Sequence, residues 1–147
     1  PGGRLCLRSM PPGDGARALI DWYVRSASAW LAPRGWSWTE RIRATPSSIA
    51  VRDLGRRWGS AGQRGAVALH WALFQLPPAL VDYVLVHELV HLDEPHHGKA
   101  FWRRLDRALP DYQQRRARLA DLGRHVWLGD VYVREPPTSP VPSTPGT

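Results

Sequence analysis

The segment between Pro77-Pro78 and Pro95 constrains the fold of this 147-residue chain more than any other part of it. Pro78 suits the first position of a helix, and Pro95 ends one because the residue before a proline avoids helical geometry. Apolar side chains lie on nearly all sides of the intervening helix, expected from Ala79 to about Asp93: Leu80, Val81, Val84, Leu85, Val86, Leu89, Val90 and Leu92. A helix that is apolar all round must be buried, so the segment predicts the central helix of a core.

Two histidines and a glutamate lie close together within this apolar helix. His87, Glu88 and His91 form the pattern His-Glu-x-x-His. Residues four apart lie on one helix face, so both imidazoles can reach a single ion, with the carboxylate beside them. Burying these groups without a partner is costly, and a metal ion would supply that partner. The pattern therefore predicts a zinc site in which Glu88 accepts a proton from zinc-bound water.

A catalytic zinc takes three protein ligands and keeps one open position, so a third ligand is needed. The proline that ends the helix allows the chain to turn back, and His96 and His97 follow it at once. Glu94 and Asp106 are further candidates, and spacing alone does not separate the two histidines. The longer metzincin pattern is excluded because Glu94 occupies its glycine position and the single methionine, Met10, lies upstream.

The rest of the chain predicts one domain at residues 16–133 that contains both helices and strands. A Gly/Pro-rich segment at 1–15 and a Pro/Ser/Thr-rich tail at 134–147 are expected to be disordered, because neither can bury enough apolar surface to fold. Apolar periodicity and breaker residues predict helices at 16–32, 79–93, 98–109 and 111–125, and strands at 48–53 and 66–71.

Two connections are less regular than these elements. Pro33-Arg34-Gly35 is expected to end the first helix, and Trp36 to Ile42 is interpreted as a short strand or part of a loop. Leu54 to Gly65 contains four glycines and is interpreted as a loop or hairpin connection.

Composition excludes several classes of protein. Cys6 is the only cysteine, so neither an internal disulfide nor a Cys-rich zinc finger can form. No apolar run approaches the roughly 20 residues of a membrane-spanning helix, and we expect a cytoplasmic protein without membrane contact. The net charge is +7, carried almost entirely by arginine, with Lys99 the single lysine. This Arg-rich surface could attract a nucleic acid or a nucleotide. We favour an ordinary solvated surface, because the chain has no basic motif interleaved with aromatic residues.

Several blocks, in this order, resemble the YgjP-like metallopeptidase family, whose relatives are the SprT-like and WLM-type zincins. The blocks are Arg57-Trp58-Gly59-Ser60, Ala68-Leu69-His70-Trp71, Leu76-Pro77-Pro78, Val81 to Leu92, Glu94 to Trp102, and Leu109-Pro110-Asp111-Tyr112. The resemblance covers roughly residues 16–127. The chain departs from the family pattern at Ala61, where the family usually has cysteine, and at His70, where it usually has asparagine.

This resemblance implies a compact α+β fold of the zincin type, with an N-terminal helix, a small antiparallel sheet, a buried His-Glu-x-x-His helix and C-terminal helices. It implies that His97 rather than His96 is the third zinc ligand, which completes the set His87, His91 and His97. The expected activity is that of a zinc metallopeptidase acting on a peptide or protein, with strand 66–71 as an edge that pairs with an extended substrate.

Two other functions fit the same residues. In the first, the same metal and base hydrolyse a phosphoanhydride in a nucleotide, and arginines bind the phosphate. In the second, the domain associates with nucleic acid through its basic surface, and zinc is structural with His96 as a fourth ligand.

Overall fold

The computed structural model describes residues 14–129, which form four α-helices, one 3-10 helix and three strands. In chain order these are α1 (Asp14–Ile42), β1 (Ser48–Arg52), β2 (Gly59–Ala61), β3 (Ala66–His70), η1 (Trp71–Gln75), α2 (Pro78–His91), α3 (Lys99–Ala108) and α4 (Tyr112–Gly123). The tail expected at 134–147 and residues 1–13 lie outside the described residues. The prediction of disorder is wrong for Asp14 and Gly15, which begin α1.

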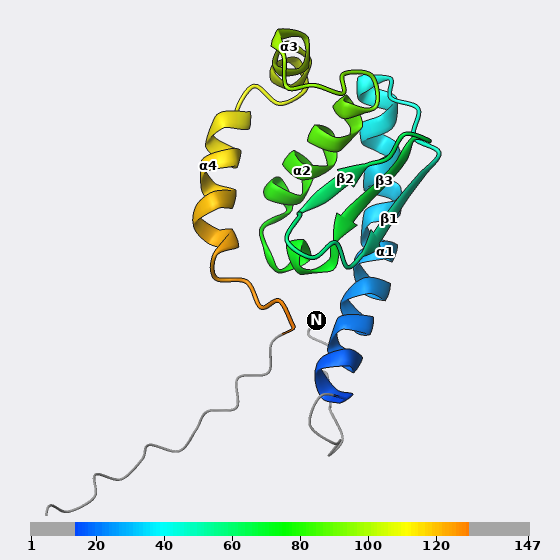
Figure 1. Cartoon of the computed structure of the whole chain (residues 1–147), viewed down its shortest axis with the longest axis vertical. Coiled ribbons are helices and arrows are strands. Elements are labelled where there is room, and N and C mark those ends of the chain that lie inside the picture. The colour runs from blue at the N-terminus through cyan, green and yellow to red at the C-terminus, as the bar shows by residue number, and fades with distance from the viewer. Residues whose placement is uncertain (1–13, 130–147) are drawn as a thin grey trace, which may run out of the picture.

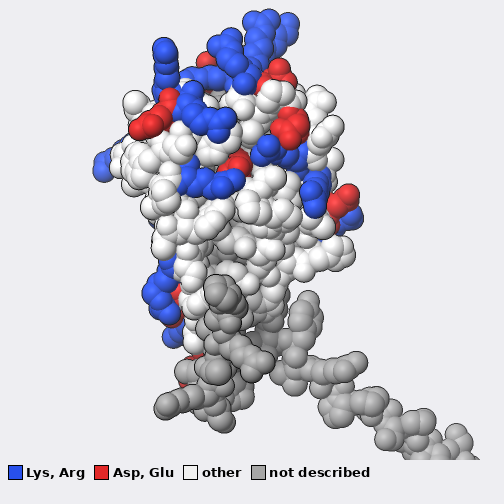
Figure 2. Space-filling view, turned by 180° about the vertical axis from the view of Figure 1, so that it is seen from behind, with Lys and Arg blue, Asp and Glu red and all other residues white. Residues whose placement is uncertain are grey.

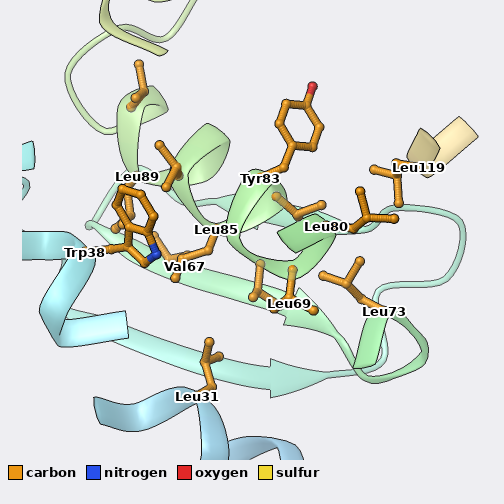
Figure 3. Packing of buried hydrophobic residues seen from close by; sticks show 14 of the residues in the cluster. Leu31, Trp38, Val67, Leu69, Leu73, Leu80, Tyr83, Leu85, Leu89 and Leu119 are labelled. Carbon is orange, nitrogen blue, oxygen red and sulfur yellow. The ribbon is translucent and has the colours of Figure 1, made fainter. Parts of the chain in front are cut away.

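The sheet lies between two helical layers (Figure 1). α1 packs on one face and α2 on the other, while α3 and α4 pack against α2. Figure 3 shows Leu85 and Leu89 of α2 on one side of the sheet and Leu31 of α1 on the opposite side. All three are almost completely buried, and each such side chain contributes about 1.5–3 kcal/mol. This core fixes α2 on the sheet and so determines which helix face is left for a site.

The sheet is mixed, with strand order β1-β3-β2. The antiparallel sheet implied by the resemblance is therefore confirmed for one pair of strands and wrong for the other. β2 pairs with β3 antiparallel, but β1 pairs with β3 in parallel. β3 takes the centre because it is the most apolar strand, with Val67, Ala68 and Leu69 buried on both faces. Because β3 is hydrogen-bonded along both edges, the expectation that strand 66–71 pairs with a substrate is wrong.

The first helix does not end at Pro33-Arg34-Gly35 but continues through this triplet to Ile42, so both predictions for residues 33–42 are wrong. Tertiary contacts account for the continuation. Arg34 forms a bidentate ion pair with Asp82 of α2, with N–O distances of 2.6 and 2.7 Å. A Cβ at Gly35 would lie 3.0 Å from Cδ1 of Ile49, so a glycine lets α1 approach β1. These contacts outweigh the backbone hydrogen bond that a proline removes.

The other predicted elements are confirmed to within a few residues. The helices expected at 79–93, 98–109 and 111–125 correspond to α2, α3 and α4, and the strands expected at 48–53 and 66–71 correspond to β1 and β3. The connection expected at 54–65 contains the three-residue strand β2. Within residues 14–129, no helix has the length and apolar character needed to span a membrane.

Candidate metal centre

Three imidazoles converge at the C-terminal end of α2. The Nε2 atom of His91 lies 3.1 Å from Nε2 of His87 and 2.9 Å from Nε2 of His97, and the remaining pair is 3.2 Å apart. Two nitrogens bound to one tetrahedral zinc at 2.0–2.1 Å are about 3.3 Å apart. Among residues 14–129, these three histidines are the cluster of side chains that could hold a metal ion. Their nitrogen–nitrogen distances are close to those expected around a tetrahedral ion.

Neighbouring groups orient two of these rings. His91 faces the backbone carbonyl of Glu94 through Nδ1 at 3.0 Å, which favours the tautomer whose Nε2 lone pair points at the other imidazoles. Trp102 of α3 donates from its indole nitrogen to the carbonyl of His97 at 3.1 Å and stacks on the His97 ring at 5.8 Å. Glu94, a predicted candidate ligand, thus contributes its backbone oxygen to the site.

Phe101 of α3 packs against all three imidazoles. Its ring centroid lies 4.9 Å from that of His87, 4.5 Å from that of His91 and 4.9 Å from that of His97, and the side chain is fully buried. Burial lowers the pKa of His87 to about 4, and the charges of His91 and His97 act in the same direction. Burial likewise lowers the pKa of His97. At neutral pH the rings of His87 and His97 are therefore unprotonated, as metal binding requires.

Glu88 lies beside the histidines and under the edge of the sheet. Burial raises its pKa to about 7, against the opposing effect of the positive charge of Arg57. A Cβ at Gly59 of β2 would lie 2.8 Å from Cγ of Glu88 and 3.0 Å from Oε1, so only glycine leaves room for this carboxylate. A carboxylate with a pKa near 7 is suited to take up and release a proton at neutral pH.

Other residues weighed from the sequence lie outside this group. His96 and Asp106 are exposed and do not belong to the histidine cluster. His70 is 3% exposed, and its contacts stabilise the chain around β3 and η1. Its Nδ1 accepts a hydrogen bond from the Ala72 amide at 2.9 Å, and its Nε2 lies 3.4 Å from a carboxylate oxygen of Asp53.

The structure places two further side chains, Tyr83 and Arg116, beside the proposed base. A cavity of about 430 Å³ opens beside His87 and Glu88, and its lining includes Tyr83 and Arg116. Figure 3 shows Tyr83 projecting from α2 on the side away from the sheet. Burial raises the pKa of Tyr83, and Arg116 opposes this shift. Tyr83 lies one helical turn before His87 and could have been found from that spacing. Arg116 is one of the arginines considered from the sequence for phosphate binding, but its position beside Glu88 depends on the packing of α4 against α2.

The chain is similar to known proteins both in sequence, at the level of a family, and in fold. The family described as "YgjP-like, metallopeptidase domain" matches residues 7–122, a range that includes the three histidines and the glutamate. The crystal structure of the metallopeptidase zymogen of Pyrococcus abyssi abylysin is similar, with a TM-score of 0.54 and 21% identity. The similarity covers 60% of this chain and 91% of that one, and it supports the α+β fold. No curated protein matches the sequence.

Proposed function

Because this chain belongs to the YgjP-like metallopeptidase family, we propose that it is a zinc-dependent peptidase in which Glu88 is the general base. His87, His91 and His97 are the proposed zinc ligands. One observation carries the proposal: three Nε2 atoms lie within 2.9–3.2 Å of one another beside a half-buried carboxylate. Zinc is the metal most often held by imidazole ligands in hydrolases of this type.

A bound zinc ion would polarise the peptide carbonyl and make water nucleophilic at neutral pH. Glu88 would accept a proton from the attacking water at a carboxylate oxygen and deliver it to the leaving amine. Its pKa of about 7 suits both transfers, because the group is neither a very weak base nor a very weak acid at that pH. Phe101 would limit the access of water to the inner side of the histidines.

The substrate backbone would pair with β2 rather than β3. β2 lies at the edge of the sheet, since β3 is its one neighbour in the strand order. Gly59 of this strand lies directly over Glu88. An extended peptide added to the free edge of β2 would therefore bring its backbone carbonyls close to the proposed base.

The decisive experiment compares the zinc-loaded wild-type protein with the Glu88→Gln variant. We expect peptide cleavage by the wild type, a loss of at least about 100-fold in the variant, and equal zinc content in both. Glu40→Gln, which removes an exposed carboxylate on α1, is the matched control and should retain activity. Cleavage that survives Glu88→Gln would refute the proposed role of the carboxylate.

Nucleotides and nucleic acids belong in the same assay, since they test the two other functions. Glu88-dependent hydrolysis of nucleotides without peptide cleavage would replace the peptidase by a phosphoanhydride hydrolase. Salt-dependent binding of nucleic acid without turnover would favour a binding module with structural zinc. Figure 2 shows Lys and Arg side chains gathered at the end of the molecule that carries α3, with Asp and Glu among them. This mixture of charges gives weaker support to a nucleic-acid surface than a purely basic face would.

The extent of the domain, residues 16–133, and the cytoplasmic location stay predictions alongside the proposed activity.

A further inference from the structure

The space around Glu88 is divided into two cavities that differ in charge. The cavity of about 430 Å³ lies between α2, α4 and the chain leading into β2, and three arginines line it: Arg56, Arg57 and Arg116. Glu88 is the one acidic residue in that lining. The second cavity, of about 810 Å³, lies on the side of His91 and His97, and its lining pairs one arginine with one aspartate besides Glu88. Only the first cavity has an excess of positive charge.

The guanidinium groups of these three arginines form no hydrogen bond or ion pair with other side chains among residues 14–129. Other arginines of α3 and α4 form ion pairs: Arg104 pairs with Asp93 at 2.6 Å, and Arg115 pairs with Asp111 at 3.0 Å. Arg116 instead lies over the ring of Trp102, with its central carbon 5.3 Å from the ring centroid. Stacking of this kind holds the guanidinium plane while leaving its N–H groups available to a ligand.

The walls of the cavity are apolar between these charges. Val84 and Leu119 are buried, and the half-buried Trp58 completes the same lining. A volume of about 430 Å³ lies in the range of ligand-binding pockets. Low-dielectric walls strengthen the field of nearby cations, and the planar fork of arginine matches the two oxygens of a carboxylate.

We propose that this cavity is a substrate subsite that binds a carboxylate next to the scissile bond, and that Arg57 and Arg116 determine the preference for it. The apolar walls would contact the methylene groups of the substrate, and the guanidinium groups would hold its charge. The inference rests on the proposed peptidase function. It deepens that function by naming the substrate class: peptides that carry an acidic side chain, or a free C-terminus, beside the bond that is cut.

The experiment is a cleavage-site survey. Zinc-loaded wild-type protein is incubated with a peptide library derived from a whole proteome, and the cut sites are identified by mass spectrometry. We expect Asp, Glu or a C-terminal carboxylate to be enriched within two positions of the cut, on one side of it. A matched peptide pair that differs only in Glu or Gln at the enriched position then gives a ratio of kcat/KM, and a second pair with a free or amidated C-terminus distinguishes the two sources of the carboxylate.

Variants connect this preference to the cavity. Arg57→Gln and Arg116→Gln should each lower the ratio of kcat/KM for the Glu and Gln peptides about tenfold, as expected for the loss of one charge-assisted hydrogen bond. Arg116→Glu should favour a peptide with Lys at that position, a reversal that a purely structural role would not produce. Arg118→Gln removes the same charge from an exposed position on α4 outside the cavity and should leave the ratio unchanged.

The outcomes separate this inference from the proposed function. Cleavage without acidic enrichment, or an acidic preference that survives both glutamine variants, would overturn the subsite and leave the peptidase intact. If the wild-type protein cuts no peptide although the Glu88→Gln variant binds zinc normally, both the subsite and the proposed peptidase function are refuted. A preference that falls equally in the Arg118→Gln control would show a general effect of surface charge and would also overturn the subsite.

Discussion

Replacing Glu88 by glutamine in chelator-treated protein tests the electrostatics of the site, because the substitution removes a charge and preserves the shape. Burial raises the pKa of Glu88 from 4.5 to about 7 in the folded protein. The unfolded chain keeps the ordinary value, so between these two pH values the folded protein holds the proton more tightly. By linkage, the contribution of Glu88 to the free energy of unfolding falls as the pH rises through this window.

The difference between the two pKa values corresponds to about 3 kcal/mol, at about 1.4 kcal/mol for each pKa unit. Near pH 4.5 the folded wild type is protonated at this position and should match the glutamine variant in stability. Above pH 8 the wild type keeps a buried charge, so the variant should be more stable by about 3 kcal/mol, or about 10 °C in Tm. The lowered pKa of His87 has the opposite pH dependence, but it is common to both proteins and cancels in the comparison.

The assay is thermal unfolding followed by circular dichroism from pH 4.5 to pH 8.5. Glu40→Gln, which alters an exposed carboxylate, should give a Tm difference that does not change with pH. A constant difference for Glu88→Gln as well would refute the argument that burial raises the pKa of Glu88. Added zinc should reduce the advantage of the variant, because a nearby dication stabilises the wild-type carboxylate.

Three further substitutions test separate parts of the structure. His97→Ala should weaken zinc binding by more than about 100-fold in a chelator competition, whereas His96→Ala, an exposed neighbour, should change it less than threefold. Gly59→Ala should lower kcat about tenfold or more at unchanged zinc content, because the new Cβ displaces Glu88; normal kcat would contradict the contact. Asp82→Ala should lower the free energy of unfolding in urea by about 2–3 kcal/mol, since it leaves arginine and tryptophan donors of α1 without their acceptor; an unchanged transition midpoint would refute this.

Local sequence information was sufficient for α2 and for part of the site. The paired prolines set the start of the helix, the apolar residues required its burial, and a spacing of four placed His87 and His91 on one face. These inferences involve residues within one or two helical turns, where backbone geometry alone fixes the relative positions of side chains. Spacing left the third ligand open among His96, His97, Glu94 and Asp106, and only the resemblance to a family favoured His97.

Contacts between distant segments decided what the sequence left open. α1 continues through Pro33 because Arg34 and Trp38 reach Asp82, more than 40 residues along the chain. His97 rather than His96 faces the cluster because Trp102 of α3 stacks on it.

The order of the strands and the positions of the arginines are likewise tertiary properties. β3 is apolar enough to lie at the centre of the sheet, but no local pattern specifies that it pairs in parallel with β1 and antiparallel with β2. Arg57 and Arg116 meet beside Glu88 because α4 packs against α2. The sequence by itself determined that His87 and His91 lie on one helix face beside Glu88, since helical spacing is local. The tertiary structure decided which third histidine joins them and which charges surround the site, since these groups come from segments that meet only when the core forms.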